Sequence, residues 1–213
     1  EFEQNAELSK KGSYLIVGKA ELFKKDLKNL SFNLEWQNLP DHKKGFEGYY
    51  REYKLKTKND DFKVRVSALS GGTFYPIADE EGNENDTRQL FFDNEGKPGL
   101  NKKTVIEDFD IKAFNIKPDY DVELPPAFNN QVNTGYFKIE LINPKYGFGH
   151  DAYTSVYTDV VMHNAHPKNK EQLSIPKTPF IPVVKKMTVD YTASTRVDVI
   201  SIGSLGKGNS AAE

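Results

Sequence analysis

Residues 30–37 read Leu-Ser-Phe-Asn-Leu-Glu-Trp-Gln, so that apolar and polar side chains alternate along the segment. Residues 62–68 repeat the pattern as Phe-Lys-Val-Arg-Val-Ser-Ala, and the pair Gly71-Gly72 follows. Successive side chains of a strand point to opposite faces, so this alternation predicts two half-buried strands. The glycine pair has the backbone freedom that a turn needs, and we expect a hairpin turn there.

Similar alternation elsewhere predicts further short strands. The clearer segments are 14–22, 120–124, 137–141 and 187–191, and the weaker ones are 74–77, 89–92, 105–114 and 197–202. One-sided strands in this number favour antiparallel sheets packed face to face. The fold class predicted is therefore mainly β, an antiparallel β-sandwich or related barrel of about eight to ten short strands.

Helical spacing is clear in only one segment. After Gly149, the apolar residues recur three or four positions apart, at Tyr153, Val156, Tyr157, Val160 and Val161. This spacing predicts an amphipathic helix over residues 150–164 that packs on a sheet. A shorter aromatic cluster at residues 46–53 predicts a single helical turn that closes one end of the core.

Composition limits the possible classes of protein. The chain has 213 residues, a formal net charge of −2 and no cysteine, and its charges are mixed along the sequence. This mixing argues against a nucleic-acid partner, and the missing cysteines exclude disulfides and thiolate metal sites. No apolar run approaches the ~20 residues of a membrane-spanning helix. We expect one domain over residues 1–204, with a possible joint near 125–134, and a flexible tail over 205–213.

No catalytic, cofactor-binding or metal-binding residue is predicted. His150, His163 and His166 surround the predicted helix, but its length places His150 and His163 ~20 Å apart, too far for one metal ion. The acidic segment 79–86 lacks the ligand spacing of an EF-hand, and we interpret it as a solvated hairpin tip. The pairs Asp108/Asp110 and Asp119/Asp121 alternate with apolar residues, so we expect them on the wet face of strands.

The aromatic residues allow two interpretations. Tyr49, Tyr50 and Tyr53, with Phe74 and Tyr75, could form a platform that stacks against sugars, or they could fill the core and line a protein interface. The sequence alone does not separate these alternatives.

Three stretches resemble the large baseplate J-like proteins of bacterial contractile injection systems, which are related to phage tail baseplates. The first lies within residues 27–92 and includes Phe-Glu-Gly-Tyr-Tyr-Arg-Glu-Tyr at 46–53. The second is the helix entry Phe148-Gly149-His150 with Tyr153. The third is the proline-spaced connector with Pro176, Pro179 and Pro182, which leads into the next strand.

These motifs also have simple structural roles. Gly149 frees the backbone at the helix start, Phe148 and Tyr153 can staple the entry, and His150 can cap the helix or bond locally. The three prolines stiffen an extended connector.

The resemblance implies a non-enzymatic assembly domain within a longer baseplate subunit. Its partners would be other baseplate, tube or sheath subunits in a cytoplasmic, hetero-oligomeric bacterial assembly, with no cofactor and no catalytic residues. The alternative hypothesis is a carbohydrate-binding or adhesin-type β-sandwich module of a cell-surface protein.

Overall fold

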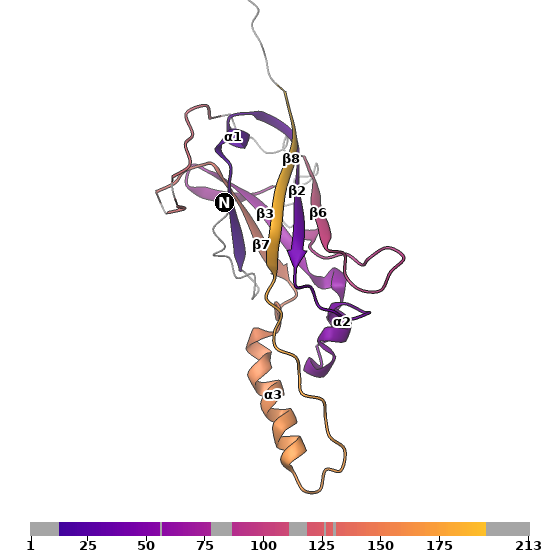
Figure 1. The fold of residues 1–213 in the computed structure, drawn as a ribbon. Coiled ribbons are helices and arrows are strands. Elements are labelled where there is room, and N and C mark those ends of the chain that lie inside the picture. Colours follow the sequence, from indigo (N-terminus) through magenta and orange to yellow (C-terminus); the bar gives the residue numbers. More distant parts are fainter. Residues whose placement is uncertain are drawn as a thin grey trace, which may run out of the picture.

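The structure is a computed structural model that describes residues 13–55, 57–77, 87–110, 119–125, 127–129 and 131–194. Within these residues, eight strands form two antiparallel sheets that face each other as a sandwich (Figure 1). The predicted mainly β sandwich is therefore confirmed. The predicted strand at 197–202, the acidic segment 79–86 and the tail 205–213 lie outside the described residues.

The first sheet has five strands. Its path runs β1 (Tyr14–Gly18), β7 (Tyr136–Asn143), β3 (Lys63–Ser70) and β4 (Thr73–Pro76), and β5 (Arg88–Gln89) also pairs with β3. Gly71 and Gly72, with φ of 55° and 81°, form the turn between β3 and β4 that the sequence predicted. Positive φ favours glycine, which explains why this pair stands here.

The second sheet has three strands in the order β6 (Lys103–Asp110), β2 (Asp26–Gln37) and β8 (Val183–Ser194). The central strand β2 pairs antiparallel with both neighbours, and Phe32 lies opposite Ile106 on one side and Val189 on the other. The alternation at 30–37 is borne out directly, because Leu30, Phe32, Leu34 and Trp36 are all buried.

Aromatic side chains join the two sheets into one core. Phe32 of β2 meets Phe137 of β7 with ring centroids 5.5 Å apart, and Phe109 of β6 lies 6.3 Å from Phe32. The same buried cluster contains Val122, which precedes residues 125–134, and Phe137, which follows them. Residues on both sides of the suggested joint therefore share one core.

Short helices close one end of the sandwich. The single helical turn predicted within residues 46–53 is present as α2 (Phe46–Tyr49) and the 3-10 helix η1 (Arg51–Tyr53). A further 3-10 helix, η2 (Asn59–Asp61), was not predicted. Phe46 is fully buried, with its ring centroid 4.4 Å from that of Phe62 and 4.9 Å from that of Phe91. At the opposite end, the turn α1 (Ala20–Phe23) replaces the second half of the strand predicted at 14–22.

The strand predicted at 120–124 is wrong. Asp119 Oδ1 accepts a hydrogen bond from the backbone N–H of Asp121 at 3.1 Å, and this local turn breaks the extended run. Val122 is buried and Leu124 Cδ2 lies 3.0 Å from the position of a Cβ on Gly135, so the apolar residues pack as a loop. Asp119 and Asp121 are therefore in an exposed turn rather than on a strand.

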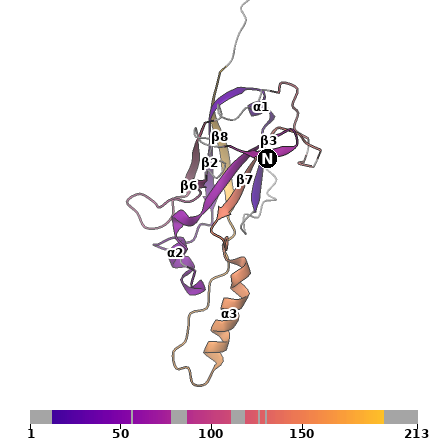
Figure 2. The same ribbon diagram turned by 180° about the vertical axis from the view of Figure 1, so that it is seen from behind.

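The predicted helix is present as α3 (His150–Ala165), but it does not pack on a sheet. Figures 1 and 2 show it projecting from one end of the sandwich, with the following chain running back beside it. Val160 is its only buried residue. The apolar spacing was correct, but the inward face of α3 contacts an extended segment and a few aromatic residues at the base of the helix.

Candidate functional site: a projecting arm

The projecting arm consists of α3 and the returning segment 166–182, which contains no helix or strand. At 1.5 Å rise per residue, the 16 residues of α3 extend ~24 Å. The arm leaves the first sheet at the end of β7 and re-enters the second sheet at the start of β8 (Figure 1).

Gly149 sets the direction in which α3 leaves the sandwich. It has φ of 82°, in the left-handed region, and a Cβ placed on it would lie 3.1 Å from Cε1 of Tyr53. Conformation and space both favour glycine here. No side chain caps the helix, so the predicted capping role of His150 is not found; instead its Nε2 lies 3.4 Å from the carbonyl oxygen of Phe180.

Three tyrosine hydroxyls hold the base of the arm. Tyr49 donates to the carbonyl of Thr178 at 2.8 Å, and Tyr53 donates to the carbonyl of Lys177 at 2.5 Å. Tyr50 donates to the carbonyl of Phe148 at 2.8 Å and accepts from the N–H of Phe180 at 3.2 Å. The hydroxyls therefore satisfy backbone groups of the returning segment and of the chain just before α3.

Burial makes the hydroxyls of these tyrosines harder to deprotonate. Loss of solvation raises the pKa of Tyr50 and Tyr53 far above the ordinary value, and it also raises the pKa of Tyr49. Tyr50 and Tyr53 are 1% and 3% exposed, so they cannot be the interface aromatics suggested by the sequence. Tyr49 remains partly exposed.

Phe148 and Tyr153 anchor the entry to α3 through separate aromatic partners, rather than through the mutual contact that the sequence suggested. Phe148 is fully buried and stacks on Phe62 at 4.7 Å, while Tyr153 stacks on Tyr53 at 6.2 Å. Pro176 and Pro182 are buried and Pro179 is partly buried in the returning segment, which places the proline-spaced motif in the arm.

The tip of the arm is held by side chains of the last helical turn. Asn164 donates from Nδ2 to the carbonyl of Leu173 at 2.9 Å and accepts from the N–H of Leu173 at 2.8 Å. His163 Nε2 lies 3.1 Å from the carbonyl oxygen of Glu171, and Asn169 Nδ2 donates to the carbonyl of His163 at 2.9 Å. These bonds fix the return of the chain without a hydrophobic core.

The outward face of α3 carries little charge. Its exposed residues are mostly small or apolar, and Asp151 and Asp159 are the only charged ones: Asp151, Thr154, Ser155, Tyr157, Thr158, Asp159, Val161, Met162 and Ala165. The helix contains no lysine or arginine. Solvated helices normally present a charged face, so this composition is typical of a face that becomes covered.

Exposed apolar side chains surround the arm on more than one side. Tyr157, Val161 and Met162 on α3 are 42%, 40% and 68% exposed, and Leu173 and Ile175 on the returning segment are 44% and 51% exposed. Positions 157 and 161 are one helical turn apart, whereas 162 is turned ~100° from 161. The sequence pattern did not reveal this surface, although the absence of lysine and arginine over 150–165 was a usable signal.

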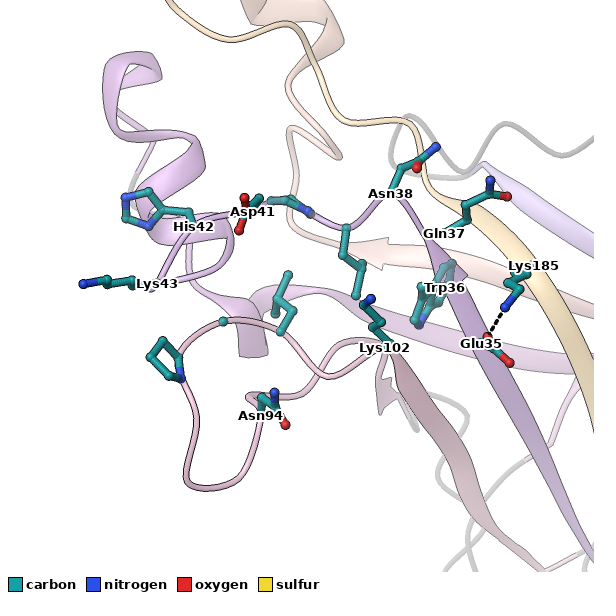
Figure 3. Close-up of a pocket in the computed structure, with 15 residues that line it drawn as sticks. Glu35, Trp36, Gln37, Asn38, Asp41, His42, Lys43, Asn94, Lys102 and Lys185 are labelled. Atoms are coloured by element: carbon teal, nitrogen blue, oxygen red, sulfur yellow. Dashed lines mark hydrogen bonds and ion pairs between the residues drawn. The ribbon is translucent and has the colours of Figure 1, made fainter.

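A groove lies where β2 ends. Figure 3 shows this groove of about 790 Å³ between the end of β2, the loop containing His42 and the turn containing Asn94. Lys185 donates to Glu35 at 2.7 Å on its rim, and this bond lowers the pKa of the Glu35 carboxyl. Trp36 lines the groove but is only 3% exposed, so it offers no stacking face for a sugar.

The histidines and acids considered for metal binding are dispersed. Over the described ranges, no three His, Asp or Glu side chains come close enough to share a metal ion. His163 is engaged at the arm tip, and His166 Nδ1 accepts from the N–H of Lys168 at 3.3 Å. The other two aromatic residues considered for a sugar platform lie in β4. Phe74 contacts Phe128 with ring centroids 6.0 Å apart, and Tyr75 is half exposed.

Comparison with protein-family models finds no match for this sequence, and comparison with curated proteins finds none either. Among the described residues, no helix has the length and apolar character required to cross a membrane.

Proposed function

We propose that this chain is a non-enzymatic assembly domain that docks to other protein subunits through its arm. The assembly we propose is a baseplate-like part of a contractile injection apparatus, as the sequence resemblance implies. Its partners would then be other baseplate, tube or sheath subunits. The sandwich holds the arm in place, and the arm provides the contact surface.

The observation that carries this proposal is the set of exposed apolar side chains on the arm, whose helix α3 has only Asp151 and Asp159 as charged exposed residues. Tyr157, Val161, Met162, Leu173 and Ile175 would each lose apolar surface to a partner, which stabilises a complex by ~25 cal/mol per Å² buried. Exposed apolar side chains gathered on one projecting element are typical of interaction sites.

The weak intrinsic stability of α3 supports the same proposal. Thr154, Val156, Thr158, Val160 and Val161 are β-branched and lose side-chain freedom in a helix. The described contacts of α3 bury only Val160, so tertiary packing compensates little for this composition. A partner that covers the outward face would supply the missing burial.

The test replaces Val161 and Met162 by aspartate in the parent protein in its native cell. We expect the variant to fold but to be absent from purified particles, as measured by mass spectrometry of subunit ratios and by electron microscopy. Charges placed on the docking face would remain desolvated in the complex. Tyr120→Asp is the matched control, because Tyr120 is an exposed aromatic residue away from the arm at 72% exposure.

Particles with tube and sheath subunits, lost only in the arm variant, would support the proposal. Normal incorporation of the arm variant would exclude the arm as the docking element. Recovery of the parent protein without tube or sheath subunits would contradict the baseplate assignment.

A further inference from the structure

A second candidate surface is the outer edge of β8. Its pairing with β2 runs without a break from Lys186, opposite Glu35, to Thr192, opposite Asn29. Within the described ranges β2 is the only strand that pairs with β8. Residues 186–192 contain no proline, so the alternate residues whose N–H groups point away from β2 can all donate to a further strand.

The opposite edge of the same sheet is protected. Arg88 of β5 donates from Nε to the carbonyl of Glu107 in β6 at 2.9 Å, and its guanidinium lies 5.2 Å from the ring centroid of Phe109. The Arg88 side chain thus occupies the Glu107 carbonyl of β6 and packs over Phe109. The contrast indicates that the two edges of the sheet have different roles.

The core is incompletely closed along β8. Met187, Val189 and Tyr191 are only partly buried, although Leu34, Phe32 and Leu30 opposite them in β2 are 3%, 0% and 2% exposed. An additional strand beside β8 would extend the sheet and cover the inward side chains from the side. Long exposed edges of this kind are usually covered in native proteins.

We propose that the outer edge of β8 pairs antiparallel with the same edge of a second copy of this chain, about a two-fold axis at Thr188. The two three-stranded sheets would become one continuous six-stranded sheet. The proposal is independent of the arm and of the identity of the larger assembly.

The side chains of β8 are self-complementary in this register. Lys186 would stand opposite Asp190 of the second copy, and Thr188 would stand opposite its own equivalent. On the inward face, Met187 would stand opposite Val189 of the second copy. A two-fold axis repeats each unlike pair, so there are two Lys–Asp pairs and two Met–Val pairs.

Hydrogen bonds within the same chain do not prevent the proposed Lys–Asp pairs. Asp190 accepts from Asn33 Nδ2 at 2.8 Å, and a carboxylate has further lone pairs for a lysine. Lys185, whose ammonium group bonds to Glu35, lies at the register shift and outside the paired run. The self-complementary segment is therefore 186–190 alone.

Sedimentation velocity on the full chain, at concentrations up to about 1 mM, tests the proposal. We expect a dimer that Lys186→Asp and Asp190→Lys each weaken by about tenfold or more, because each change converts two attractive pairs into repulsive ones. An equimolar mixture of the two variants should form a heterodimer, since aspartate at 186 then meets lysine at 190. Lys103→Asp, which alters charge on β6 of the same sheet, is the control and should dimerise normally.

Hydrogen exchange supplies the second readout. Amides of residues 186–190 that point away from β2 should be protected in the wild-type dimer and unprotected in either single variant. A chain that remains monomeric over this range, a dimer that persists in both single variants, or variants that fail to combine would each overturn the proposed pairing.

Discussion

The sandwich and the arm are stabilised in different ways. In the sandwich, the ring centroid of Phe46 lies within 6.0 Å of five other aromatic rings: Tyr50, Phe62, Phe91, Phe148 and Phe180. The helix of the arm buries only Val160 and depends on hydrogen bonds at its base and tip. Burial of aromatic side chains is therefore sufficient to stabilise the sandwich. The arm has a defined direction, but its apolar side chains stay exposed.

The largest effect should come from Phe46→Ala. Phe46 is fully buried among aromatic rings, so truncation should lower the free energy of unfolding by ~3–5 kcal/mol through lost burial and a cavity. Chemical denaturation followed by circular dichroism measures this change. Tyr75→Ala, at a half-exposed position in β4, is the control and should change stability little. A loss below ~1 kcal/mol for Phe46→Ala would show that these aromatic contacts contribute little to stability.

Tyr50→Phe should have an intermediate effect at the junction between the two regions. It removes one hydroxyl and leaves the carbonyl of Phe148 and the N–H of Phe180 without that partner, at a cost of ~1–3 kcal/mol. Thermal unfolding measures the total loss, and hydrogen exchange in α3 should show whether the arm loosens first. Tyr49→Phe, which loses a solvent-exposed bond, should cost less; equal losses would argue against burial as the cause.

The smallest effect on global stability should come from Asn164→Ala at the arm tip. Its two bonds to Leu173 are solvent-exposed, so we expect a loss of ~1 kcal/mol or less. The local effect should be clearer, with faster proteolysis within residues 166–175 and an unchanged sandwich. Thr158→Ala, at an exposed position in the same helix, is the control. Unaltered proteolysis would show that the apolar contacts suffice to hold the tip.

The sandwich was predictable because its strands are one-sided. Alternation at 30–37 and 62–68 corresponds to β2 and β3, where inward residues such as Phe32 and Val64 are completely buried. Tyr120 to Leu124 alternate equally well but form a loop, because Asp119 satisfies a backbone N–H locally. Period-two patterns do not report such local hydrogen bonds, so the sequence overestimated the strands there.

The arm was only partly predictable. The apolar spacing located α3 to within one residue at its C-terminal end, yet it could not specify what the inward face would contact. A helix packed on a sheet and a helix packed on an extended segment need the same spacing. The roles of Tyr50 and Tyr53 depend on partners more than 90 residues away in sequence, which no local pattern contains.

The path of the chain through the arm has a mechanical consequence. One end of the arm continues from β7 and the other continues into β8, and these strands belong to different sheets (Figure 1). A force that tilts the arm is therefore divided between the two layers and loads them in shear, across the interface where Phe32 meets Phe137. The hydrogen bonds of the tyrosine hydroxyls at the base of the arm oppose this tilt before the two sheets are strained.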